Sequence, residues 1–151
     1  MKDIKFIEVN EEIKREWMNY SNWTDKVNDE VIRISDGWSI IAEKNTEMMG
    51  IISVYYRKMD EPFENTVEAY IDNIEVLEPF RTKGVASQLI KEAISRVEKD
   101  VTIYQIRSWS SKDKTAMLKL WKKMGFGLCP VLQHYGDVKV PGFFVSKVLY
   151  N

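Results

Sequence analysis

The sequence predicts an α/β fold, a sandwich whose sheet mixes antiparallel and parallel strand pairing. Segments of strand-like composition and segments of helical apolar spacing alternate in the order β-α-α-β-β-β-α-β-α-β-β. The chain has 151 residues, 44% apolar and 30% charged, which is enough for a core and too hydrophobic for disorder. We therefore expect one domain that spans residues 1–151.

The composition excludes several classes of partner and site. The chain has 22 Lys and Arg against 23 Asp and Glu without a run of like charges, so we expect no nucleic-acid or membrane partner. The single cysteine, Cys129, cannot form an internal disulfide, and no apolar stretch is typical of a signal peptide or membrane span. A cytoplasmic protein is expected. One His and one Cys also exclude most zinc and Cys-His or Ser-His-Asp sites, and we expect no metal.

The first elements are a strand and two short helices. Residues 4–9 alternate as a strand does, and a helix follows over residues 11–20 behind an Asn10 cap. Apolar residues then recur at helical spacing from Val27 to the breaker at residues 36–37, which predicts the second helix.

Three strands come next, and the third has an irregular pattern. Residues 38–42 and 50–56 are rich in Ile, Val and aromatic residues and flank a polar turn, which predicts an antiparallel hairpin. In residues 66–77 the apolar parity changes by one residue near Asp72 and Asn73. An extra residue re-aims every later side chain, so we predict a β-bulge there. A strand buried on both faces is the alternative.

The C-terminal half alternates helices and strands. Residues 83–99 carry one apolar stripe typical of a helix, and residues 101–106 form a short β-rich run. Residues 112–124 are strongly periodic and end at Gly125, as helices commonly do. The last two predicted strands are residues 126–132 and 142–150. Turn-prone pairs lie near them at residues 136–137 and 141–142.

The turn Arg81-Thr82-Lys83-Gly84-Val85-Ala86 has the residue types of an anion site. It connects a strand to a helix, where unpaired N–H groups and the helix dipole converge. Gly84 lets a ligand approach the backbone, Ala86 keeps the first helical turn narrow, and Arg81 and Lys83 add positive charge. We expect this turn to bind a phosphate group.

The segment from Val76 to Ala86 resembles the Arg/Gln-x-x-Gly-x-Gly/Ala signature of the GNAT superfamily of N-acetyltransferases, which follows a strand ending in Val. Residues 121–126 resemble the family's aromatic-x-Lys-x-Gly-Phe helix end, and residues 142–145 resemble its last strand. The resemblance covers nearly the whole chain and is strongest over residues 69–126. It implies a three-layer α+β sandwich whose mixed, mostly antiparallel seven-stranded sheet has a splayed parallel pair in its middle and about four flanking helices.

The resemblance also implies that acetyl-CoA, the acyl donor, binds between the two splayed strands. Ile74 and Val76 would pair through their backbone with the pantetheine arm, leaving the thioester beside a backbone N–H that stabilises an oxyanion. Lys114 takes the place of a usual Asn and is a candidate phosphate ligand, with a solvated lysine as the alternative. The diphosphate would lie on Arg81, Thr82, Lys83, Gly84, Val85 and Ala86.

Catalysis needs a group that accepts a proton from the acceptor amine, because an alkyl ammonium has a pKa of about 10. In similar enzymes a Glu or His on the strand before the signature serves, and the matching positions are Tyr70 and Asp72. Asp72 could act through a water or satisfy the backbone at the bulge, and Tyr70 could instead be a pocket wall. Glu68 and Glu75 are weaker candidates.

Trp121 stands where many family members have the tyrosine that protonates the departing thiolate. An indole N–H is far too weak an acid for this, so the thiolate would leave unprotonated or take a proton from water or from another tyrosine such as Tyr104. Because Trp121 lies on the apolar stripe of its helix, core packing explains it as well as a cofactor contact does.

These inferences predict an N-acetyltransferase that moves the acetyl group of acetyl-CoA to a primary amine by direct attack on the thioester. The acceptor is a small-molecule amine, a peptide N-terminus or a lysine, and the protein is a monomer or a homodimer. Because the usual tyrosine is missing, a catalytically idle acyl-CoA-binding or regulatory domain is the alternative. An interaction module whose turn binds no ligand is the third hypothesis.

Overall fold

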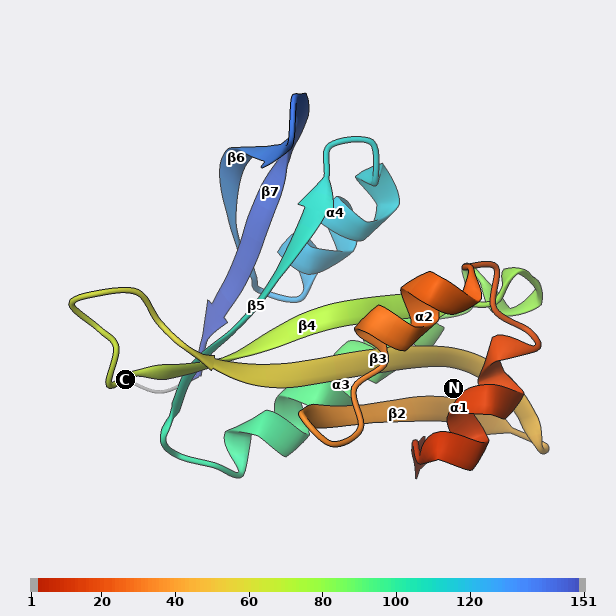
Figure 1. The fold of residues 1–151 in the computed structure, drawn as a ribbon. Coiled ribbons are helices and arrows are strands. Elements are labelled where there is room, and N and C mark those ends of the chain that lie inside the picture. Colours follow the sequence, from red (N-terminus) through yellow and green to blue (C-terminus); the bar gives the residue numbers. More distant parts are fainter. Residues whose placement is uncertain (1–2, 150–151) are drawn as a thin grey trace.

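The computed structural model describes residues 3–149, which build one seven-stranded sheet with helices on both faces (Figure 1). The strands are β1 (Lys5–Glu8), β2 (Gly37–Lys44), β3 (Glu47–Lys58), β4 (Val67–Val76), β5 (Ile103–Ser111), β6 (Gly127–Tyr135) and β7 (Val138–Val148). They lie in the order β1-β2-β3-β4-β5-β7-β6. In this sheet only β4 and β5 pair in parallel, and the other neighbours are antiparallel. The predicted mixed sheet with a central parallel pair is confirmed.

Helices cover both faces of the sheet. They are α1 (Glu11–Met18), α2 (Asp25–Val31), the one-turn 3-10 helix η1 (Glu78–Phe80), α3 (Val85–Glu98) and α4 (Thr115–Lys123). Figure 1 shows α1 and α2 on the near side of β2–β4, and α3 on the far side. The helices and strands follow the predicted order. Within residues 3–149, none of these helices is both long and apolar enough to cross a bilayer.

The first two helices begin at side-chain caps and end earlier than the apolar spacing predicts. Asn10 Oδ1 accepts a hydrogen bond from the Ile13 amide at 2.8 Å, and Thr24 Oγ1 accepts one from the Val27 amide at 3.2 Å. The predicted continuation of α2 toward residue 36 is wrong, because Ile32 is extended and packs into the core.

Two apolar clusters hold the sheet between its helices. One cluster joins the sheet to α3 and α4, and the other joins it to α1 and α2. Ile40 belongs to the first cluster and Ile41 to the second, and Ile52 and Ile51 divide in the same way. Because β2 and β3 are covered on both faces, their sequences read as nearly continuous apolar runs.

The predicted bulge in β4 is confirmed. Ser53 of β3 faces Asn73, whereas the next residue, Val54, faces Ile71, so Asp72 is the extra residue on β4. Ile71 and Ile74 therefore pack toward the same cluster although they are three residues apart. The bulge explains the parity change that the sequence shows.

The last hairpin corrects one prediction. Strand β7 runs straight through residues 141–142, so the turn predicted there is wrong, whereas the turn at residues 136–137 is confirmed. At Pro141 the strand pairs with β6, and its ladder with β5 begins one residue later, while the Pro141 carbonyl accepts a hydrogen bond from the Lys112 amide at 2.9 Å just beyond β5. Proline has no N–H to donate, and a strand tolerates it where the ladder that would use this N–H ends. The end of the predicted strand at Tyr150 lies outside the described residues.

Candidate active site

The parallel strands β4 and β5 form a fork. They pair from Val67 and Ile103 as far as Tyr70 and Arg107, and beyond this point residues 71–76 keep β3 as their only strand neighbour in the described sheet. At the junction the Ser108 hydroxyl donates to the Ile71 carbonyl at 2.8 Å. Figure 1 shows β5 turning away from β4, accompanied by β6, β7 and α4. One edge of β4 is therefore available to a ligand beyond the junction.

Ile74 and Val76, predicted to pair with the pantetheine arm, lie on this free part of β4. The bulge at Asp72 comes directly before them, and bulges bend the strand that carries them. The structure thus brings the predicted bulge and the predicted pantetheine edge together at the fork.

The turn at residues 81–84 leads directly into α3. Thr82 and Gly84 have left-handed backbones, with φ of 63° and 84°. Helix α3 begins at Val85 without a side-chain cap, and the first N–H groups of a helix have no acceptor within it. A Cβ built on Gly84 meets no protein atom nearer than Ser87 Oγ at 3.8 Å. The space over the turn is therefore free for an anion.

Two contacts fix the position of the turn on the sheet. Arg81 donates from Nε to the Val76 carbonyl at 2.9 Å, which ties the turn to the end of β4. Beneath the start of α3 lies Gly50, where a Cβ would approach Glu75 O to 3.0 Å and Val85 Cγ1 to 3.2 Å. The missing side chain lets the first turn of α3 pack closely on β3. Thr82 and Lys83 are exposed at the surface.

Trp121 and Lys114, the two cofactor candidates on the second half of the chain, differ in their surroundings. Trp121 is 1% exposed, packs on Phe126 with ring centroids 4.8 Å apart, and donates from Nε1 to Ser110 Oγ at 3.1 Å. It joins α4 to β5 beyond the fork, which accounts for its place in the core. Lys114 is exposed and directly precedes α4. Contact of either residue with a cofactor stays a prediction.

Asp72 has a partner that the sequence did not reveal. Arg33 donates to Asp72 Oδ2 from Nε at 3.1 Å and from Nη2 at 2.6 Å, and to Asp36 Oδ2 from Nη1 at 2.6 Å. Burial alone would lower the pKa of Arg33, but the hydrogen bonds to Asp72 and Asp36 outweigh it and raise that pKa. The same contact with Arg33 lowers the pKa of Asp36. Among the described residues, Asp72 Oδ1 accepts no hydrogen bond.

Tyr70 is half-buried beside one aromatic ring and two guanidinium groups. The Arg57 guanidinium lies 4.1 Å from its ring centroid, the Arg107 guanidinium lies 5.9 Å away, and the Tyr55 ring lies 5.6 Å away. Burial raises the pKa of Tyr70 to about 12. The phenol is thus neutral at physiological pH, which suits a pocket wall and does not suit a general base.

Glu68 and Glu75, the weaker carboxylate candidates, are both engaged in structural contacts. Glu68 is 1% exposed and accepts hydrogen bonds from Arg57 Nε, Arg107 Nη2 and Gln105 Nε2 at 2.8, 2.6 and 2.7 Å. Burial would raise its pKa, but these bonds prevail and lower it. Glu75 is buried and accepts from Ser21 Oγ at 2.7 Å and from the Asn22 amide at 2.9 Å. It holds the α1–α2 connection on β4.

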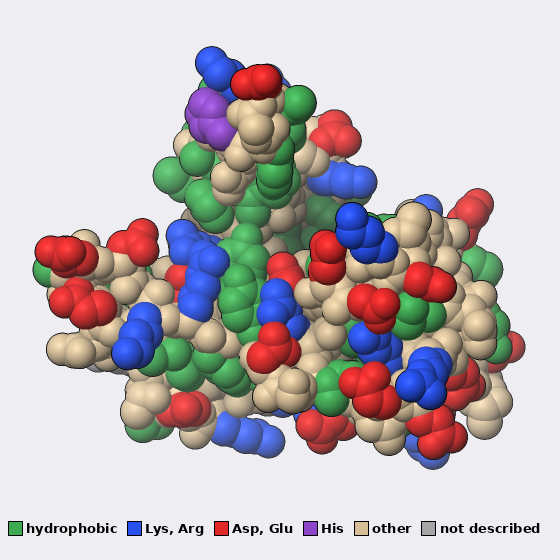
Figure 2. Space-filling model, viewed as in Figure 1, with side chains coloured by type: hydrophobic (Ala, Val, Ile, Leu, Met, Phe, Trp, Pro, Cys, Tyr) green, Lys and Arg blue, Asp and Glu red, His purple; other side chains and the backbone are tan. Residues whose placement is uncertain are grey.

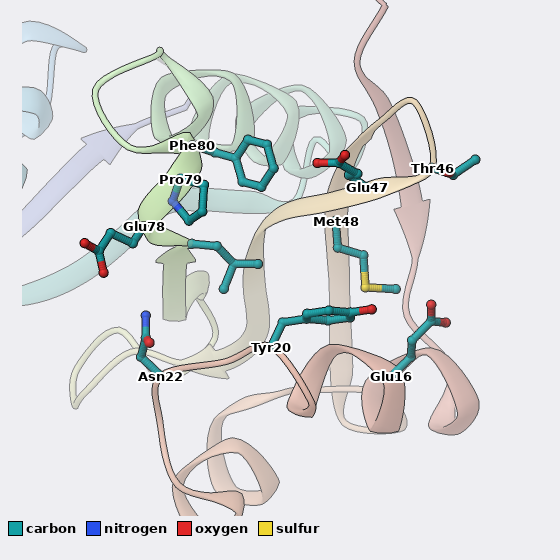
Figure 3. A pocket seen from close by; sticks show the side chains of 10 residues that line it. Glu16, Tyr20, Asn22, Thr46, Glu47, Met48, Glu78, Pro79 and Phe80 are labelled. Atoms are coloured by element: carbon teal, nitrogen blue, oxygen red, sulfur yellow. The ribbon is translucent and has the colours of Figure 1, made fainter.

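A cavity of about 510 Å³ lies between α1, the β2–β3 turn and η1. Figure 3 shows the rings of Tyr20 and Phe80 on opposite sides of it, with Met48 and Glu47 also reaching its walls. None of the predicted site residues lines this cavity. Within residues 3–149 no three His, Cys, Asp or Glu side chains gather as metal ligands.

Comparisons with known proteins agree with this geometry. The family model described as the acetyltransferase (GNAT) family matches residues 6–126, and a comparison with curated proteins finds no significant match. The fold is similar to that of Arabidopsis thaliana NAA60 in complex with a bisubstrate analogue (TM-score 0.78, 15% identity, 96% of this chain and 97% of that chain). It is also similar to the ribosomal-protein-S18-alanine N-acetyltransferase from Escherichia coli (0.75, 12%, 97% and 94%). A third similar structure is a GNAT family acetyltransferase from Elizabethkingia anophelis with acetyl-CoA bound (0.73, 18%, 99% and 100%).

Proposed function

Because this chain belongs to the acetyltransferase (GNAT) family, we propose that it is an N-acetyltransferase that moves the acetyl group of acetyl-CoA to a primary amine. One observation carries the proposal: the uncapped start of α3, with free space over Gly84, follows the strand edge that the fork leaves without a neighbour. A structure of similar fold from Elizabethkingia anophelis has acetyl-CoA bound, which supports this donor.

The donor is proposed to lie along β4 and to end at the turn. Its pantetheine arm pairs with the backbone of Ile74 and Val76 as an added strand would, at Val76 through the N–H, because Arg81 already binds the carbonyl. Its diphosphate accepts hydrogen bonds from the amides of residues 82–86, where the helix dipole favours negative charge. The positive charges of Lys83 and of Arg81, whose Nη groups are not used in the bond to Val76, support binding of the diphosphate. Lys114 is the proposed ligand of a further phosphate.

The proposed reaction is direct transfer. The acceptor ammonium first loses a proton, and the neutral nitrogen then attacks the thioester carbonyl carbon. The carbonyl electrons move to oxygen, where a backbone N–H of β4 near the bulge stabilises the oxyanion. The tetrahedral intermediate collapses with cleavage of the C–S bond and loss of the second nitrogen proton. The products are an N-acetyl amide and the CoA thiolate, which water protonates.

Asp72 is the proposed base, acting through a water. Its Oδ1 accepts no hydrogen bond from the described residues, while its Oδ2 is held by Arg33. The ion pair orients the Asp72 carboxylate at the bulge. Asp72 directly follows Ile71, whose carbonyl accepts the hydrogen bond from Ser108 at the junction of β4 and β5. Tyr70 is a neutral wall of the acceptor site. Trp121 supplies no acid, because its N–H is bound to Ser110.

Release of CoA thiol from acetyl-CoA in the presence of a panel of primary amines tests the proposal. We expect steady-state release that depends on the amine. Tight acetyl-CoA binding without turnover for any amine would instead favour an idle acyl-CoA-binding domain. Failure of acetyl-CoA to bind in calorimetry would favour an interaction module.

We place the reaction in the cytoplasm, since the exposed free thiol of Cys129 suits a reducing compartment.

A further inference from the structure

A row of alternating arginine and aromatic side chains lies on the α1–α2 face of the fork. Three guanidinium groups stack on three rings, with distances of 4.1, 4.1 and 4.8 Å from Cζ to ring centroid. The pairs, which we call the arginine–aromatic row, are Arg33 on Tyr55, Arg57 on Tyr70 and Arg107 on Phe144. Figure 2 shows basic, acidic and hydrophobic side chains meeting where the part built on β5–β7 joins the part built on β2–β4. This junction therefore presents a surface of mixed polarity.

The two ends of the row lie close to the reacting centre. The Ser108 hydroxyl donates to the Ile71 carbonyl across the fork at 2.8 Å. Arg107 directly precedes Ser108 on β5, and Asp72 directly follows Ile71 on β4. Asp72 reaches the row through its ion pair with Arg33. Asp72 and Arg107 therefore lie next to the junction of the fork on neighbouring strands, close to the bulge where the thioester is proposed to react.

The charges along the row are not balanced locally. Arg57 and Arg107 share one carboxylate, that of Glu68, so one positive charge at this end has no partner. The Arg107 Nε atom is buried and makes no hydrogen bond within the described part of the chain. At the other end Arg33 alone faces two carboxylates, Asp36 and Asp72, which leaves one negative charge in excess. The site has a positive end and a negative end.

We infer that the acceptor is a primary amine that carries a carboxylate a short distance from its nitrogen. Its ammonium group lies toward Asp72 before deprotonation, and its carboxylate lies toward Arg107, with Arg57 adding charge. A guanidinium binds a carboxylate through charge-assisted N–H groups, and the Arg107 side chain is 27% exposed and shares the single Glu68 carboxylate with Arg57, so it has charge left for an acceptor carboxylate. Two sources share this chemistry: a free amino acid, and a peptide whose first residue is Asp or Glu. The inference rests on the proposed acetyl transfer and specifies its acceptor.

Matched acceptor pairs test the inference with the wild-type enzyme. Free amino acids are compared with their α-amides, and peptides beginning with Asp or Glu are compared with those beginning with Asn or Gln, by CoA thiol release. We expect kcat/KM to be roughly tenfold higher for the carboxylate member, as one charge-assisted contact provides. The set in which the preference appears identifies the source. Turnover without preference in either set overturns the inference and leaves acetyl transfer intact. Binding of acetyl-CoA without turnover across the panel overturns both.

Substitution of Arg107 separates recognition from folding. In Arg107→Gln we expect KM for the carboxylate acceptor to rise roughly tenfold, while KM for its amide partner and the affinity for acetyl-CoA stay unchanged. Arg107→Lys should recover part of the preference. The matched control is Arg96→Gln, whose side chain pairs with Glu92 on α3 at the opposite face and should leave the preference intact. Equal losses for both acceptors in Arg107→Gln would assign Arg107 a purely structural role and refute the inference.

Discussion

Replacing Gly84 with alanine adds one Cβ at the turn proposed to hold the diphosphate, and its two effects can be calculated separately. The first is backbone strain, because φ at this residue is 84°. A left-handed backbone costs an L-residue about 1–2 kcal/mol, which for a chain of this size lowers Tm by roughly 2–8 °C. Gly136→Ala is the matched control: its φ is 62° and a Cβ there meets nothing within 4 Å. Both variants should therefore lose similar stability.

The second effect is on binding and is confined to Gly84. The new Cβ enters the space over the turn, since the nearest protein atom is Ser87 Oγ at 3.8 Å. Displacing the diphosphate from one charged hydrogen bond costs about 1.5–3 kcal/mol, so the Kd for acetyl-CoA should rise at least about tenfold. Gly84→Glu adds a carboxylate beside the phosphates and should remove measurable binding. Gly136→Ala should bind as the wild type does.

Isothermal titration with acetyl-CoA, together with thermal unfolding of each variant, measures both effects. An unchanged Kd in Gly84→Ala and Gly84→Glu would refute the assignment of the turn. An equal loss of affinity in Gly136→Ala would attribute the effect to general destabilisation instead.

Three further substitutions test the roles of the acidic and phenolic side chains. Asp72→Asn should lower kcat about a hundredfold while acetyl-CoA affinity stays nearly constant, because general bases contribute roughly 10²–10⁴. The control Asp29→Asn breaks a more exposed ion pair with Lys14 and should leave kcat unchanged. Glu68→Gln should cost about 3 kcal/mol at pH 7, since it leaves two guanidiniums without their carboxylate. The lowered pKa of Glu68 makes its stabilisation complete above about pH 4.3 and lost as pH falls through the folded-state pKa, so the difference in Tm from wild type should shrink near pH 3. An equal difference at both pH values would contradict this. Tyr70→Phe should keep the wild-type pH–rate profile up to about pH 10, since a phenol with a pKa of about 12 does not titrate there; loss of a basic limb would make Tyr70 a proton carrier.

The features of the fold that the sequence predicts correctly are those that depend on residues close together in the chain. The bulge at Asp72 appears as a change of parity within one strand, and the turn before α3 appears as glycine and basic residues at a strand–helix junction. The turn predicted at residues 141–142 is wrong, because whether a strand continues through a proline depends on where the ladder with the neighbouring strand ends. That information is not local.

The polar partners of the site could not be predicted because they come from distant segments. Arg33 lies 39 residues from Asp72, and nothing in the spacing connects them. The contacts of Glu68 are similar, since Arg107 meets it only through the register of β4 and β5. A charged residue in the middle of a strand indicates that it needs a polar partner, but its position does not identify which residue that partner is. The row of arginines therefore emerges from the folded sheet and not from the sequence.

A crystal structure of the complex with acetyl-CoA tests the central claim most directly. The account predicts the diphosphate on the amides of residues 82–86 and the pantetheine arm paired with Ile74 and Val76 along the free edge of β4. A diphosphate bound elsewhere, with β4 and β5 paired beyond Tyr70 and Arg107, would contradict it.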